Sequence, residues 1–129
     1  MEFKHELVKS NEDISAKYHN ILVPPMVVPK HWHSHLEIIY ILEGNLEVEI
    51  NNSKYLIEEN QLIVISPRDI HFTAHKESNT GILLQIPYEF LENNIDDVQN
   101  IHFECNPYIN NSQYATYENN IKTSNMYTY

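Results

Sequence analysis

The stretch HWHSHLEIIYILEGNLEVEINNSKYLIEENQLIVISPRDIH, residues 31–71, decides the fold of this chain. Its clearest part is LEVEI, in which Leu46, Val48 and Ile50 alternate with Glu47 and Glu49. Because successive side chains of a strand point to opposite faces, this alternation predicts an antiparallel strand with one buried face.

Similar short runs, rich in β-branched and aromatic residues, flank this strand and are separated by turn-forming residues. They are EIIYILE (37–43), KYLIEE (54–59), LIVIS (62–66), IHFTAH (70–75) and ILLQI (82–86). Five or six short strands at close, even spacing are typical of a sandwich or barrel. No strand–helix–strand alternation occurs, so we predict a mainly all-β fold, a small antiparallel barrel.

Outside these runs the sequence is less regular. Residues 1–20 are polar and mixed, and are predicted to form a short strand or an arm. Residues 24–29 hold three prolines, which indicate an edge strand or an extended lead-in because proline cannot donate to a β-ladder. Only two glycines, Gly44 and Gly81, occur in the chain, so we expect asparagine to occupy many turns.

The part of the chain after Ile86 changes character. Pro87 is suited to the first turn of a short helix over PYEFLEN. Residues 93–129 are polar, and the spacing of Tyr114, Tyr117 and Ile121 leaves open either a helix near 112–122 or a loosely ordered tail. We predict a barrel domain over residues 1–92, with an arm at 1–20, and a polar linker or helical tail over 93–129.

Composition limits the partners and the compartment. The 129 residues suffice for one domain, and 18 acids against 8 bases give a formal net charge of −10. Such a charge repels phosphate backbones and anionic membrane surfaces, so we expect this chain itself to contact neither nucleic acid nor membrane. The single cysteine, Cys105, permits no internal disulfide, and no apolar run has the length of a signal or membrane segment. We expect a cytoplasmic protein.

Histidines crowd near the centre of the chain and carry its chemistry. His31, His33 and His71, together with the carboxylate of Glu37, form a donor set that suits a divalent transition metal such as Zn, Mn, Fe, Ni or Cu. In a straight strand His31 and Glu37 would lie about 20 Å apart, at roughly 3.3 Å per residue. Joint ligation therefore requires a bend or bulge between His33 and Glu37.

Two other roles for these histidines stay open. Imidazole and carboxylate groups can line a pocket for a small organic molecule without any metal, or they can be plain structural residues. The usual catalytic motifs for nucleophilic, nucleotide-dependent or zinc-protease chemistry are absent from the sequence. Pocket candidates and metal candidates are thus the same four residues: His31, His33, Glu37 and His71.

The spacing His31-x-His33-x3-Glu37-x6-Gly44 resembles the first motif of the cupins. The later ENQLIVISPRDIH resembles their second motif in reduced form, with Asn60 where a turn glycine is usual. This resemblance implies a cupin or jelly-roll barrel with a short C-terminal helix or helices.

Within the cupins, residues 31–71 look very like the N-terminal sensor domain of AraC/XylS-type transcriptional regulators, and ILLQIPYEFLEN looks like the end of that barrel. The resemblance implies a small-molecule effector (a sugar or a small organic acid), a homodimer, no enzymatic activity and no required cofactor. Residues 93–129 are too short and acidic for the family's helix-turn-helix part, which we expect to be missing from this chain. The alternative is a metal-dependent cupin enzyme of the dioxygenase or isomerase class.

Overall fold

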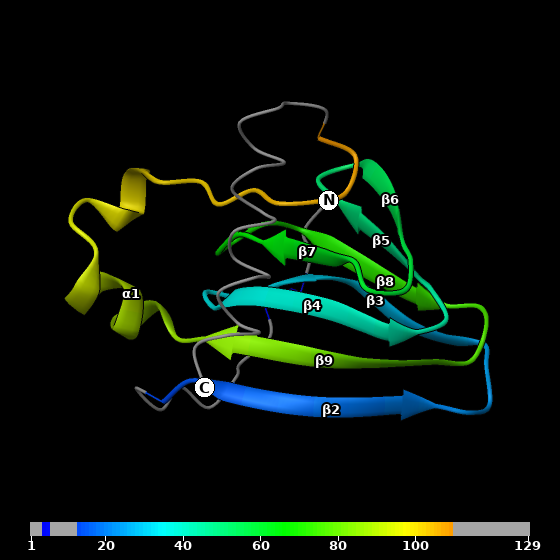
Figure 1. The fold of residues 1–129 in the computed structure, drawn as a ribbon. Coiled ribbons are helices and arrows are strands. Elements are labelled where there is room, and N and C mark those ends of the chain that lie inside the picture. Colours follow the sequence, from blue (N-terminus) through cyan, green and yellow to red (C-terminus); the bar gives the residue numbers. More distant parts are fainter. Residues whose placement is uncertain (1–3, 6–12, 110–129) are drawn as a thin grey trace.

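Two β-sheets face each other in a computed structural model that describes residues 4–5 and 13–109 (Figure 1). One sheet has five strands in the order β1-β3-β8-β5-β6, and the other has four in the order β2-β9-β4-β7. All pairings are antiparallel except that of β1 with β3. The prediction of a mainly all-β, antiparallel barrel is confirmed.

The five-stranded sheet contains His31 and His71, two of the four predicted site residues. Its strands are β1 (Lys4–His5), β3 (Met26–Trp32), β8 (His71–His75), β5 (Leu46–Ile50) and β6 (Ser53–Ile57). The four-stranded sheet consists of β2 (Ser15–Ile21), β9 (Asn79–Ile86), β4 (Leu36–Glu43) and β7 (Leu62–Ile65). The six strands expected between residues 37 and 86 are all present, close to their predicted bounds.

Asparagine fills several turns, as expected from the scarcity of glycine. Asn51 and Asn52 connect β5 to β6 with φ angles of 46° and 74°, and Asn60 precedes β7 with a φ of 63°. Asparagine tolerates this left-handed region better than most residues because its short side chain bonds locally. Gly44 has a φ of 78°, and a Cβ there would clash with the carbonyl oxygen of Ser78.

An apolar core fills one part of the space between the sheets. Its buried members come from four strands of both sheets: Ile39, Ile41, Leu46, Val48, Ile57, Ile63 and Ile65. They occupy alternate positions in β4, β5 and β7, as the period of two requires. The inward positions of β8 are different, because they are His71, Thr73 and His75.

The chain leaves the barrel through a short helix and then returns along it. Helix α1 (Tyr88–Asn94) follows Pro87, as predicted, and the 3-10 helix η1 (Val98–Asn100) comes next. Leu36, Leu91 and Val98 form a second small core there. Figure 1 shows the following segment running back past β7 and β6, where the amide of Val64 donates to the carbonyl of Cys105 at 2.8 Å.

The predictions for the two ends of the chain have different outcomes. Residues 15–20 belong to β2, so the strand expected within the arm exists, whereas the helix considered near 112–122 lies outside the described residues. The boundary at residues 92 and 93 stays a prediction, although residues 101–108 pack against the barrel. Within the described part of the chain, no helix reaches the length and apolarity needed to cross a bilayer.

Candidate functional site

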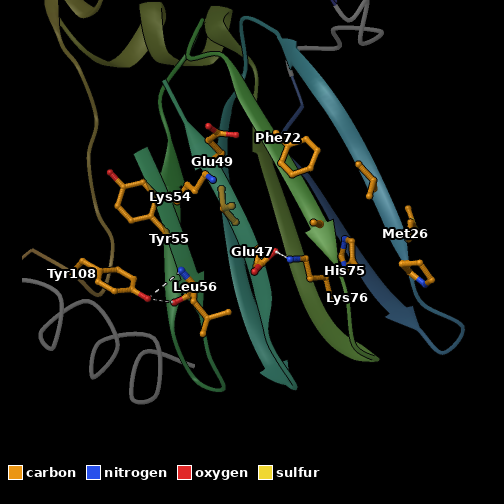
Figure 2. Close-up of a pocket in the computed structure, with 14 residues that line it drawn as sticks. Met26, Glu47, Glu49, Lys54, Tyr55, Leu56, Phe72, His75, Lys76 and Tyr108 are labelled. Carbon is orange, nitrogen blue, oxygen red and sulfur yellow. Dashed lines mark hydrogen bonds and ion pairs between the residues drawn. The ribbon is translucent and has the colours of Figure 1, made fainter. Parts of the chain in front are cut away.

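Among the residues that the structure describes, the two larger hollows along the five-stranded sheet lie on its opposite faces. The larger, of about 600 Å³, lies on the outer face of that sheet, between Tyr108, Leu56 and Phe72 (Figure 2). Two of its polar contacts lie at the surface: Lys76 pairs with Glu47 at 3.0 Å, and the Tyr108 hydroxyl bonds the backbone of Leu56. The smaller hollow is a cavity of about 280 Å³ between the two sheets.

The inner cavity is the candidate site, because it contains buried groups with acid–base and metal-binding chemistry. Residues from six strands line it: Lys17, His19, Ile21, Met26, Val28, His31, Glu37, Ile39, Leu46, His71, Thr73, His75, Leu83 and Gln85. Polar side chains are rarely buried without a specific role or partner. Three of the four predicted site residues line this cavity directly.

Three imidazoles converge at one end of the cavity. A ring nitrogen from each of His31, His33 and His71 lies within 4.8 Å of the other two, and His33 and His71 are only 2% exposed. The Glu37 carboxylate joins them, since its Oε2 lies 3.2 Å from the Nε2 atoms of both His33 and His71. The structure therefore brings together all four residues that the sequence singled out.

A break in the chain makes this convergence possible. Strand β3 ends at Trp32 and β4 begins at Leu36, so the chain crosses from one sheet to the other between His33 and Glu37. The β3–β8 register also shifts between Val28 and His31. The bend that joint ligation required is present, and the 20 Å separation of a straight strand does not arise.

His35, the fourth histidine in this region, does not belong to the converging group. Its ring packs edge-on against that of His33, with centroids 5.8 Å apart, and it is 4% exposed. His35 lies within the break between β3 and β4, so its ring neighbours the converging group without joining it.

Backbone carbonyls orient two of the imidazoles. His31 Nδ1 donates to the carbonyl of Pro29 at 2.7 Å, and His71 Nδ1 donates to the carbonyl of Asp69 at 2.9 Å. A carbonyl can only accept, so each Nδ1 carries a proton, and in a neutral ring Nε2 then has the free lone pair. Metal-binding histidines are commonly oriented in this way.

Glu37 is held as a carboxylate. Burial alone would raise its pKa, but hydrogen bonds and favourable charge interactions with His33 and His71 outweigh burial and lower the pKa to about 2. Glu37 belongs to β4 of the four-stranded sheet, whereas His71 belongs to β8 of the five-stranded sheet and His33 lies where the chain crosses between them. These contacts therefore also hold the two sheets together.

The contact between Glu37 and His71 restricts what can occupy this end. A carboxylate oxygen and a neutral Nε2 lone pair at 3.2 Å would repel each other, since both are acceptors. The contact is favourable when His71 carries a second proton or when a cation binds both atoms. Three imidazoles and one carboxylate fit a divalent transition metal. The Nδ1 atom of His33 is buried without a hydrogen-bond partner among the described residues, so no backbone carbonyl orients this ring as it does the other two.

A second polar group, which the sequence analysis missed, lies at the other end of the cavity. His19 Nε2 lies 2.9 Å from Asn79 Oδ1, and Asn79 Nδ2 lies 2.7 Å from His75 Nδ1. Burial lowers the pKa of His75, the Asn79 hydrogen bond opposes this shift, and the nearby His19 adds to it. His75 has the same parity as His71 in one strand, a signal that could have found it.

The fold and this polar interior define a cupin-type ligand-binding barrel. The family model described as AraC-like ligand binding domain matches residues 23–116. The match covers more than half of the chain, so the chain belongs to the AraC-like ligand binding domain family. No curated protein sequence matches the chain.

Solved structures share this fold. A conserved protein of unknown function from Streptococcus pyogenes has a TM-score of 0.56 and 19% identity, over 60% of this chain and 68% of its own. A cupin superfamily protein from Desulfitobacterium hafniense has a TM-score of 0.55 and 14% identity, over 63% and 72%. An RmlC-like cupin from Shewanella frigidimarina has a TM-score of 0.55 and 17% identity, over 60% and 69%. These likenesses concern the fold alone.

Proposed function

We propose that this chain is the effector-binding sensor domain of an AraC-type transcriptional regulator, and that its effector is a small molecule bound between the sheets. The observation that carries the proposal is the buried polar cavity with His31, Glu37 and His71 at one end. Such groups are costly to bury, so a ligand that uses their hydrogen-bonding capacity offers a reason for their presence. The cavity volume of about 280 Å³ suits one small sugar or organic acid.

In this proposal the histidines bind and orient the effector and cause no chemical turnover. His71 is held by the Asp69 carbonyl, and His31 by the Pro29 carbonyl, so both rings are oriented before a ligand arrives. Preoriented groups lose less entropy on binding, which favours affinity. Binding then shifts an equilibrium between two states of the domain, because the ligand prefers one of them.

A homodimer and a cytoplasmic location belong to the same proposal. Exposed apolar side chains at the β2–β3 connection, with Leu22 72% and Val23 86% exposed, offer surface for a second copy. The net charge of −10 supports a domain that does not itself contact DNA. Sedimentation at rising protein concentration should show dimers, and monomer alone at the highest concentration would contradict this part.

The binding proposal is tested by titrating the purified protein with a panel of sugars and small organic acids in a calorimeter. At least one compound should bind in the wild type, and His71→Ala should weaken it at least tenfold. Lys54→Gln, on the outer face of the sheet, is the matched control and should bind normally. Binding that His71→Ala leaves unchanged would place the ligand elsewhere and overturn the proposal.

A second candidate function is a metal-dependent cupin enzyme of the dioxygenase or isomerase class. It is favoured by one observation, the convergence of three histidine nitrogens within 4.8 Å beside the Glu37 carboxylate. His31, His33, His71 and Glu37 would hold the ion, which would supply Lewis-acid or redox chemistry. Elemental analysis after dialysis decides: one retained equivalent of metal that is lost in His31→Ala supports this candidate, and retention below a tenth of an equivalent contradicts it.

A further inference from the structure

The cavity has a polar group at each end: His31, His71 and Glu37 at one end, and His19, Asn79 and His75 at the other. On β9, Gln85 pairs with Glu37 and Gly81 pairs with His19, so four residues separate the two levels. On β8, His71 and His75 are likewise four residues apart and face the same side. Four residues of strand span about 13 Å at roughly 3.3 Å per residue.

The space between the two ends is mostly apolar. Val28, Ile39 and Leu83 line it, and Lys17 and Thr73 contribute the polar groups at this level. A ligand that reaches both ends therefore has an apolar middle. With a hydrogen bond of about 3 Å at each end, its two polar groups lie about 7 Å apart.

The far end offers a hydrogen-bond donor to the cavity. Asn79 is 2% exposed and lies between two imidazoles, so its amide orientation fixes their protons. His75 Nδ1 lies 3.1 Å from Asn79 Oδ1 and 2.7 Å from Asn79 Nδ2. With His19 Nε2–H donating to Asn79 Oδ1, the amide nitrogen donates to His75 Nδ1 across the shorter of these two contacts. The proton of His75 then resides on Nε2, and that N–H is available to a ligand oxygen.

The position of His19 depends on the glycine beneath it. A Cβ on Gly81 would lie 2.6 Å from His19 Cε1 and 2.8 Å from the carbonyl oxygen of Tyr40. Real contacts of this kind are not that short, so Gly81 leaves the space in which the His19 ring reaches Asn79. One of the two glycines in the chain thus supports the far polar group.

We propose that His19, Asn79 and His75 form a second ligand subsite, and that the effector is an elongated organic acid with an uncharged oxygen at its far end. The carboxylate lies toward the His31–His71 end and accepts from the Lys17 ammonium, which lines the cavity between the two ends. The hydroxyl or carbonyl oxygen accepts from His75 Nε2–H. Among the described lining residues, the far end has no carboxylate, ammonium or guanidinium group, which suits an uncharged oxygen.

This inference rests on the proposed function, and matched aromatic acids separate the two. Para-hydroxybenzoate and benzoate differ only in the far hydroxyl, and meta-hydroxybenzoate moves that hydroxyl off the long axis. By calorimetry, wild type should bind the para isomer about fivefold tighter than benzoate, the effect of one buried hydrogen bond. The meta isomer should gain less than twofold.

The variant His75→Phe should bind para-hydroxybenzoate and benzoate equally, while Tyr108→Phe on the outer face keeps the preference. Equal binding of the three acids by wild type overturns the subsite and leaves the proposed function standing. A para preference that survives in folded His75→Phe also overturns it. If none of the acids binds, the proposal that the effector is an organic acid is overturned. The proposed function itself is overturned only if the sugars of the panel also fail to bind. The isomer comparison in wild type decides even if His75→Phe does not fold.

Discussion

The two faces of strand β8 reverse the usual distribution of residues in a barrel strand, in which apolar side chains point inward and polar ones outward. His71 and Thr73 face the inner cavity, Phe72 and Ala74 face the outer groove, and His75, at the end of the strand, lines both (Figure 2). A strand selected only for stability would place its apolar residues inside. The difference indicates that the inner face serves binding and that apolar packing is supplied by β4, β5 and β7 instead.

The largest expected effect compares the apolar part of the interior with the outer groove. Ile41 is 0% exposed, and Ile41→Ala should lower the free energy of unfolding by about 3–4 kcal/mol, because it removes buried methyl groups and leaves a cavity. Leu56→Ala, at a side chain 38% exposed on the outer face, should cost less than about 1 kcal/mol. Urea denaturation measures both, and similar losses would show that the two faces contribute alike.

Glu37→Gln sharpens the comparison within the interior. The substitution keeps the shape but removes the charge that two imidazoles bond, so the free energy of unfolding at neutral pH should fall by about 2 kcal/mol. Glu49→Gln, on the outer face of the same barrel, should change it by less than about 0.5 kcal/mol. Thermal and urea unfolding of both variants provide the measurement. A Glu37→Gln protein as stable as wild type would mean that the carboxylate is kept for binding alone.

Phe72→Ser tests whether the outer groove matters to the cavity. Phe72 and Thr73 are neighbours that face opposite sides of one sheet, so the substitution should leave ligand affinity within about twofold while costing about 1 kcal/mol of stability. Thr73→Val, on the inner side, should weaken the ligand that wild type binds. A larger loss of affinity in Phe72→Ser than in Thr73→Val would reverse the assignment of the two faces.

The smallest effect concerns pH. Burial lowers the pKa of His75 in the folded protein, so the unfolded chain binds the proton more readily than the folded one. The contribution of His75 to stability is therefore constant above the ordinary histidine pKa of about 6.5 and decreases as pH falls below it. Stability measured from neutral to mildly acidic pH should fall less steeply in His75→Gln than in wild type, by under about 1 kcal/mol. An unchanged slope would contradict this role of His75.

Much of this fold follows from local rules that the sequence displays. The period of two placed the strands from residue 37 to 86, and asparagine at positions 51, 52 and 60 adopts the left-handed turns expected of it. The four predicted site residues come together because the chain breaks between Trp32 and Leu36. The spacing of the site residues placed a bend between His33 and Glu37, whereas its form, a crossing from one sheet to the other, depends on how the two sheets pack.

The second polar group was not predictable in the same way. His19 lies in a polar stretch without a clear period, and Asn79 looks like an ordinary loop residue before a glycine. They meet only because β2 pairs with β9 over seven residues, from Ser15–Gln85 to Ile21–Asn79. Such pairing between distant segments is a property of topology, and no local pattern encodes it.

Asp69 links two parts of the molecule through its backbone and its side chain. Its carbonyl accepts a hydrogen bond from His71 Nδ1 in the cavity, while its carboxylate bonds His102 Nε2 at 3.1–3.2 Å in the segment that leaves the barrel. The same carboxylate accepts from the amide of Ser66, whose hydroxyl in turn accepts from the amide of Phe103. Asp69 therefore connects the His71 ring to the segment that leaves the barrel through a continuous chain of hydrogen bonds. A displacement of the His71 ring by a fraction of an ångström would change the hydrogen-exchange rate of the Phe103 amide at the end of that chain.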